Sequence, residues 1–134
     1  MFNVDGVSNI ENHWLANHKM IEDRKNRDST YSLCPTSTLI GVDLNRNFGV
    51  DFGQQDEILK YQKNTFENEA DVNQSTNACS TYYPGPEAFS EPETRAFRDF
   101  LTEHKDEIKF VLNIHSTGNA FIYPFNGRKN NDIE

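Results

Sequence analysis

The sequence predicts an α/β fold in a single domain that covers residues 1–134. A helical pattern over about residues 90–104 leads into Phe110–Ile114, a nearly continuous apolar run of strand length. A helix followed by a strand that is covered on both faces is an αβ unit. A second apolar stretch, Leu39–Ile40, reads as the end of another strand, and polar residues follow both strand ends. Because open α/β sheets bind ligands outside the carboxyl ends of their strands, we expect a functional site there.

Composition and charge limit the class of protein. The 134 residues suffice for one domain with a core, and 12% aromatic residues argue against disorder despite a mean hydropathy of −0.79. A net charge of −8 disfavours nucleic acid as a partner, because its phosphates are neutralised by Lys and Arg. No apolar run approaches the ~18–20 residues that span a bilayer. No signal peptide is visible at the start of the chain.

The first thirty or so residues predict a turn, a helix and a basic loop. Residues 3–6 contain Asp-Gly, which is typical of a turn. Three apolar residues have the spacing of one face of a short helix packed on a core: Val7, Ile10 and Trp14. Residues 24–27, Arg-Lys-Asn-Arg, form the only basic cluster. Such a run is usually a solvated loop, but its positive potential could also hold an anion, which makes Arg24 a candidate.

Two cysteines, Cys34 and Cys79, leave two possibilities open. A disulfide between them would close a loop of roughly 45 residues and stabilise the fold by about 4 kcal/mol in the chain-entropy model. Two buried thiols in a cytosolic protein would fit the composition equally well. Asn73-Gln74-Ser75 fits a glycosylation acceptor, although such triplets are common. Together these features lean towards a secreted protein.

The stretch Gly41–Phe48 places an acid, an amide and a guanidinium within four residues, as Asp43, Asn45 and Arg46. The planar fork of Arg46 can grip a carboxylate or phosphate through two hydrogen bonds, and Asn45 can add a donor and an acceptor. The alternative is a polar turn in which Arg46 merely pairs with Asp43. These residues alone favour neither reading.

The second half of the chain begins with a polar insertion over about residues 52–78, whose length is typical of a functional or mobile loop. Ser90 and Glu93 have the spacing of a capping box that starts a helix running to about His104. The helix would bury one apolar face: Ala96, Phe97, Phe100 and Leu101. Phe121–Pro124 reads as a further short strand.

His115 stands at the carboxyl end of the strand predicted over 110–114. A lone histidine is more often structural, but small residues and glycine follow this one and would let a ligand approach. Neutral imidazole is a common ligand of zinc, so His115 is a candidate for binding Zn²⁺. His104 and Glu107 also have metal-ligand spacing, but they precede the strand and lie nearly 20 Å (~3.3 Å rise per residue) from its far end. They cannot share an ion with His115.

The order of these motifs resembles the central part of the zinc carboxypeptidases of the carboxypeptidase A/B type, the M14 peptidase family. Nearly the whole chain except the insertion takes part. The matching segments are 3–6, 24–27, Cys34, 41–48, Cys79, 83–85, 89–93, 113–116 and 123–124. Two small departures are Val4, where the family usually has proline, and Thr117, where an aromatic residue is common.

The resemblance implies a role for each candidate residue. His115 looks like a zinc ligand, and Asp43 looks like an acid that orients a zinc-bound histidine. Asn45 and Arg46 look like the pair that binds the free C-terminal carboxylate of a peptide or protein substrate, while Arg24 looks like the arginine that stabilises the oxyanion. A disulfide is likewise implied between Cys34 and Cys79, and with it an extracellular or lysosome-like compartment. The implied fold is a mixed, twisted β-sheet with helices on both faces.

The same resemblance implies that the chain is a partial catalytic domain. The family's other two zinc ligands, its general-base glutamate and its substrate-covering tyrosine have no counterpart among the 134 residues. We therefore expect a metallocarboxypeptidase whose 134-residue part is inactive alone. One rival is a non-catalytic carboxypeptidase-like binding module that keeps only the carboxylate clamp. The other is a plain α/β interaction domain in which the motifs are coincidence.

Overall fold

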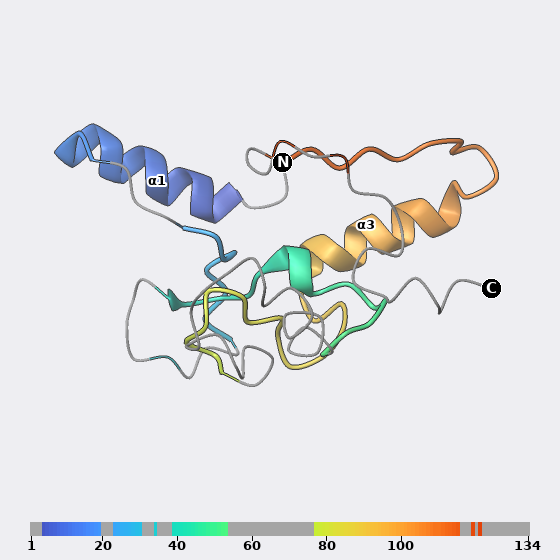
Figure 1. Ribbon diagram of the computed structural model, residues 1–134, viewed down its shortest axis with the longest axis horizontal. Coiled ribbons are helices and arrows are strands. Elements are labelled where there is room, and N and C mark those ends of the chain that lie inside the picture. The colour runs from blue at the N-terminus through green and yellow to red at the C-terminus, as the bar shows by residue number, and fades with distance from the viewer. Residues whose placement is uncertain are drawn as a thin grey trace.

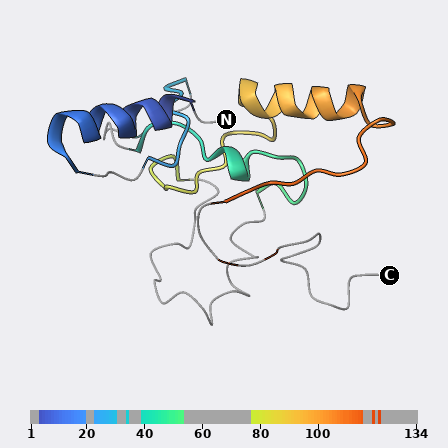
Figure 2. The same ribbon diagram turned by 90° about the horizontal axis from the view of Figure 1, so that it is seen from above.

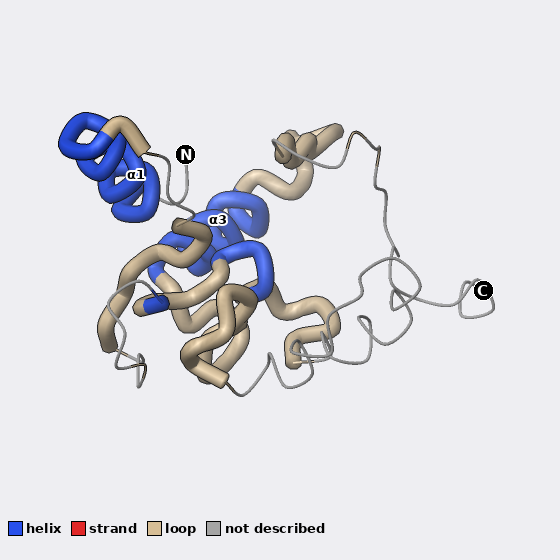
Figure 3. Tube along the Cα trace, turned by 60° about the vertical axis from the view of Figure 1, so that its left-hand side comes forward, coloured by secondary structure: helices blue, strands red, loops and turns tan. Residues whose placement is uncertain are grey.

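The computed structural model describes residues 4–19, 23–30, 34, 39–53, 77–115, 119 and 121. Its regular elements are helix α1 (Val4–Asn17), the 3₁₀ helix η2 (Leu44–Arg46) and helix α3 (Pro92–Glu103). Figure 1 shows irregular loops gathered around η2, with α1 extending to one side and α3 to the other. Seen from above, α1 and α3 do not lie against each other (Figure 2). Figure 3 shows that helices and loops make up the described part of the chain, without a strand.

Helix α1 confirms the predicted helix but not the turn before it. The helix begins at Val4, so the turn predicted over residues 3–6 is wrong for its described residues. Asp5 lies in the first helical turn, where its carboxylate interacts favourably with the positive end of the helix dipole. The expected packing on a core is also wrong, because Trp14 is 46% exposed and the helices share few contacts in the described chain.

The centre of the molecule, here called the polar centre, consists of residues 24–27, 41–49 and 83–94. Its segments are joined by separate backbone hydrogen bonds and not by a regular ladder. The bonds run from Asn26 N to Val42 O (3.0 Å), from Asp43 N to Tyr83 O (2.8 Å) and from Phe89 N to Asn47 O (2.7 Å). The strand end predicted at 39–40 is therefore wrong: the chain turns at Gly41, whose φ of 99° suits glycine, and enters η2.

The buried core of the described residues is small and largely polar. Its apolar members are Cys34, Val42, Leu44 and Tyr83. Asn47 is fully buried and connects η2 to α3: its Nδ2 donates to Pro84 O (2.7 Å) and Ser90 Oγ (2.8 Å). Its Oδ1 accepts from Glu91 N (3.2 Å) and Thr94 Oγ1 (2.6 Å). A buried amide costs free energy unless it is hydrogen-bonded, so these bonds are what make Asn47 tolerable there.

The Glu91 carboxylate, also fully buried, ties two further segments together. Its Oε2 accepts from Asn26 Nδ2 (2.6 Å), and its Oε1 accepts from Ser90 Oγ (2.7 Å). Asn26 in turn accepts from Val42 N through Oδ1 (2.9 Å). Gly85 permits this close packing, because a Cβ there would lie 2.6 Å from Ser90 Oγ. The polar centre is thus a connected hydrogen-bond network.

Helix α3 confirms the helix predicted to end near His104, which is its C-cap residue. The predicted capping box is wrong, because the N-cap residue is Glu91 and no side chain caps the helix. The hydroxyl of Ser90 accepts from Asn47 and donates to Glu91, so it is not available to the amide of Glu93. The interior network therefore takes precedence over the local capping pattern.

The apolar side of α3 and the run after it are open. The predicted buried face of α3 is only partly covered: Ala96 and Phe100 are exposed, and Phe97 and Leu101 are intermediate. Residues 110–114 do not form the predicted strand in the described structure, and Phe110 is 77% exposed. A strand needs a neighbour for its backbone groups, and the described residues contain none. We call residues 108–115 the apolar arm; it doubles back relative to α3 (Figures 1 and 2).

Some predictions fall outside the described residues. They concern most of the insertion (54–76), the glycosylation triplet at Asn73, and the strand over 121–124 beyond Phe121. Among the helices that are described, none has the length and apolar character needed to cross a membrane.

Candidate functional site

Asp43 organises the cluster that the sequence singled out. Its side chain is buried, and its Oδ2 accepts from Arg24 Nε at 2.6 Å. Its Oδ1 accepts from Asn45 N (3.1 Å), so Asp43 is the N-cap residue of η2. One carboxylate therefore fixes both the guanidinium of Arg24 and the turn that carries Asn45 and Arg46. In the simple turn considered above, Asp43 would serve Arg46 alone; here it also holds Arg24.

Arg46 lies at the end of η2 in a partly buried position. Burial lowers the pKa of its guanidinium, and the nearby charge of Arg24 lowers that pKa further, while Asp43 and Tyr82 raise it. Because arginine starts from so high a pKa, Arg46 stays cationic at neutral pH. Arg24 and Arg46, which are 22 positions apart in the sequence, thus face one region.

Tyr82 is a member of this site that sequence reasoning missed. The centroid of its ring lies 4.9 Å from Arg24 Cζ and 5.5 Å from Arg46 Cζ, within cation–π range. The sequence showed only a turn-rich aromatic segment between Cys79 and Pro86. The available sequence signal for Tyr82 is weak. It is an aromatic residue close to a disulfide cysteine, in an acidic chain with few arginines.

The arrangement can bind an anion with two oxygens. Guanidinium forks match the geometry of carboxylates, and Arg24 and Arg46 present two such forks around one ring and one acid. The side chain of Asn45 is exposed beside Arg46 and offers an amide to the same ligand. The structure therefore brings together Arg24, Asp43, Asn45 and Arg46.

His115 is not brought to this cluster. It is exposed at the end of the apolar arm and makes no hydrogen bond or ion pair with the other described candidates. Across the described ranges, no group of three or more His, Cys, Asp or Glu side chains could hold a metal ion. The donors present therefore do not by themselves fit a zinc ion.

The pair of His104 and Glu107, excluded above as partners of His115 on one ion, lies at the end of α3. His104 is the C-cap residue of α3, and its Nδ1 lies 3.6 Å from Glu107 Oε2 while its ring packs on Phe100. The ring thus contacts a carboxylate and a phenyl group. A second His–Glu pair, His18 and Glu22, which are four positions apart, lies partly outside the described residues.

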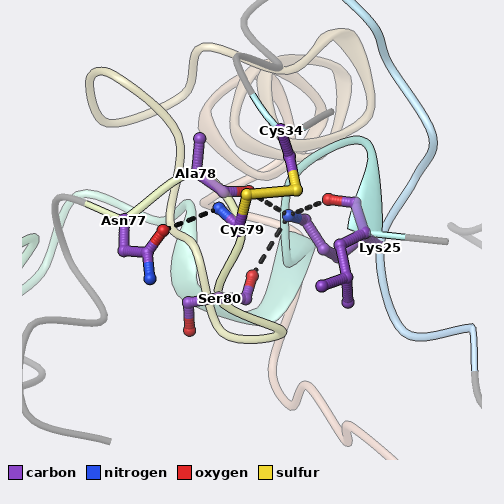
Figure 4. The surroundings of a disulfide bond; sticks show 7 residues. Lys25, Cys34, Asn77, Ala78, Cys79 and Ser80 are labelled. Atoms are coloured by element: carbon purple, nitrogen blue, oxygen red, sulfur yellow. Dashed lines mark hydrogen bonds between the residues drawn. A yellow bond between two sulfur atoms is a disulfide. The ribbon is translucent and has the colours of Figure 1, made fainter. Parts of the chain in front are cut away.

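The predicted cross-link is confirmed: Cys34 and Cys79 form a disulfide. Lys25 lies beside it, only 2% exposed, so the solvated-loop reading of 24–27 is wrong at this position (Figure 4). Lys25 Nζ donates to three backbone carbonyls: Leu39 O (2.6 Å), Ala78 O (2.7 Å) and Ser80 O (3.1 Å). Burial lowers the pKa of Lys25 to about 8, against an opposing effect of Asp43. The ammonium group therefore anchors both sides of Cys79 to the segment of Arg24.

Comparison with known proteins gives a consistent result. The family model described as zinc carboxypeptidase matches residues 1–134. Mast cell carboxypeptidase A of Rattus norvegicus is 31% identical over 125 residues, which are 93% of this chain and 24% of that protein. Carboxypeptidase B of Homo sapiens is 34% identical over 124 residues, 92% of this chain and 25% of that protein. The chain thus spans about a quarter of the length of these relatives. No solved structure gives a significant match.

Proposed function

This chain belongs to the zinc carboxypeptidase family, and from that premise we propose that the whole protein is a zinc-dependent metallocarboxypeptidase. It would hydrolyse the C-terminal peptide bond of peptides and proteins. The observation that carries the proposal is the gathering of Arg24 and Arg46 around Asp43 and Tyr82. A clamp of this kind recognises a carboxylate, which is the group that separates a chain terminus from an internal peptide bond.

We assign the roles as follows. Arg46 and Asn45 bind the terminal carboxylate, because a bidentate fork beside an amide suits two adjacent oxygens. Arg24 faces the preceding carbonyl and stabilises the negative charge that develops on its oxygen. Asp43 holds Arg24 through Nε, a contact that favours this orienting role. The role of Asp43 towards a zinc-bound histidine remains a separate proposal.

Family membership implies Zn²⁺. Bound zinc supplies an activated water and polarises a carbonyl. His115 is our proposed contribution of this chain to the zinc site, with the remaining ligands and the general base outside the 134 residues. On this view the 134-residue part has low zinc affinity and no activity alone. Its residues bind and orient the substrate.

Three finer proposals accompany the activity. The apolar run 110–114 is a strand of a mixed, twisted sheet with helices on both faces in the whole protein, and residues 1–134 belong to one partial catalytic domain with an insertion at about 52–78. A secreted or lysosome-like location is supported by the disulfide, which persists in oxidising compartments. Nucleic acid is an unsuitable partner for a chain of net charge −8.

The test uses the full-length protein and an N-acylated dipeptide, with the corresponding C-terminal amide as control. We expect chelator-sensitive release of the last residue from the acid and not from the amide. Arg46→Met should raise KM by roughly 10- to 100-fold, because it removes hydrogen bonds to a charged group. Arg24→Met should lower kcat by about 100- to 1,000-fold. Hydrolysis of acid and amide at equal rates would contradict the proposal.

The alternative is a non-catalytic binding module that retains only the carboxylate clamp. The observation in its favour is that the clamp residues are assembled in the described chain without a metal-holding group beside them. It predicts that the full-length protein binds the dipeptide acid in preference to the amide but releases no product, with or without added Zn²⁺. The same pair of ligands therefore separates the two functions.

A further inference from the structure

We propose that Tyr82 is a positioning residue, whose ring holds the guanidinium groups of Arg24 and Arg46 side by side so that both act on one anionic ligand. This inference rests on the proposed function, because it deepens the account of the same site. The two Cζ atoms lie 4.9 and 5.5 Å from the ring centroid. One aromatic ring thus contacts the two arginines that contribute to the clamp.

Two adjacent guanidinium groups repel each other. This repulsion must be offset if the two groups are to stay close together in the ligand-free protein. Burial lowers the pKa of Arg46, and the charge of Arg24 acts in the same direction. Asp43 offsets part of the repulsion through its bond to Arg24 Nε. The electron-rich face of Tyr82 attracts both cations and adds to the effect of Asp43.

The ring can do this because its backbone is fixed on both sides. Tyr82 N donates to Ser80 Oγ (3.1 Å), and the carbonyl of Tyr83 accepts from Asp43 N (2.8 Å). Ser80 O accepts from Lys25 Nζ, next to the disulfide at Cys79. The ring is therefore carried by a segment that is tied to Asp43 and to the residue after Arg24.

The position of Tyr82 also differs in kind from that of its neighbour. Tyr83 is buried in the core, while Tyr82 is half-buried at the surface where the arginines lie. The attraction needs the ring and not the hydroxyl group, since a phenyl face also binds cations. Tyr82→Phe should therefore keep the function of the residue, whereas Tyr82→Leu, which is apolar but has no ring, should lose it.

The experiment compares wild-type, Tyr82→Phe and Tyr82→Leu forms of the full-length protein, with N-acetylglycine as the carboxylate probe and its amide as control. Titration followed by NMR gives the affinity, and the Nε–Hε resonances of Arg24 and Arg46 report the ring directly through its ring current. We expect Tyr82→Leu to weaken N-acetylglycine binding by about 5- to 30-fold and to shift both arginine resonances. Tyr82→Phe should stay within about twofold of wild type.

A role in the core alone would lower stability and leave the affinity of the folded protein for N-acetylglycine unchanged. That result for Tyr82→Leu would overturn the proposal. If Tyr82→Leu does not fold, Tyr82→Met provides a second variant without a ring. Peptide hydrolysis is measured separately on the wild-type protein. Ring-dependent binding without hydrolysis would refute the proposed enzyme activity and support the positioning role of Tyr82. Hydrolysis by the wild-type protein, with unaltered arginine resonances in Tyr82→Leu, would support the activity and refute the positioning role.

Discussion

The polar centre and the apolar arm have opposite relations to solvent. The polar centre buries Asn26, Asn47 and Glu91 almost completely, although these are polar or charged side chains. The apolar arm exposes Phe110 by 77% and Ile114 by 81%. The difference follows from where each finds its partners. The side chains of Asn26, Asn47 and Glu91 are hydrogen-bonded within the described chain. A strand in the arm, by contrast, needs neighbours that the described residues do not supply.

Removal of the disulfide is expected to destabilise the polar centre more than any other change considered. Replacing Cys34 and Cys79 together by serine opens a loop of sequence separation 45. We expect a loss of about 4 kcal/mol in the free energy of unfolding, measured by urea denaturation, because the unfolded chain regains loop entropy. The carbonyls on both sides of Cys79 would remain tied to Lys25. A loss well under 1 kcal/mol would indicate that this lysine alone holds the segment.

Asn47 tests the hydrogen-bond network itself. Asn47→Leu should cost roughly 3 kcal/mol, because the hydroxyl of Thr94 and the carbonyl of Pro84 lose a buried partner. Asn45→Leu is the matched control: it lies two residues earlier on an exposed position and should change stability by less than about 0.5 kcal/mol. Equal costs in the two variants would show that the network contributes little.

The network also explains what the sequence could and could not predict. Both helices and the cluster around Asp43 and Arg46 follow from local patterns, and the disulfide from the family resemblance. The hydrogen bond between Asn26 and Glu91 joins positions 65 apart, so no local sequence pattern predicts it. The capping prediction failed for the same reason, because Ser90 Oγ accepts from Asn47, which is distant in the sequence. Tyr82 was missed because its two cationic partners come from distant segments.

Lys25 connects stability of the polar centre to pH. Its pKa is about 8 in the folded protein against 10.5 for an ordinary lysine, so the unfolded state binds more protons between these values. Stability therefore gains a favourable contribution as pH rises from about 8 towards 10.5. In Lys25→Met this contribution should be absent. Urea denaturation at pH 7.5 and pH 10 should give a smaller gain, or a larger loss, for the variant than for wild type. Parallel changes would contradict the assignment.

The smallest change in stability is expected in the apolar arm of the 134-residue chain. This variant gives the clearest contrast between the apolar arm and the polar centre. In the 134-residue chain, Ile114→Ser should change the free energy of unfolding by less than about 0.5 kcal/mol, because the side chain is 81% exposed. In the full-length protein the proposed sheet would cover the run on both faces, and the same change should cost roughly 3 kcal/mol. Hydrogen exchange gives the matching readout: amides of 110–114 should be protected in the full-length protein only, while that of Asn47 is protected in both. A run that stays unprotected in the full-length protein would refute the proposed strand, because a paired strand cannot leave its amides open to water.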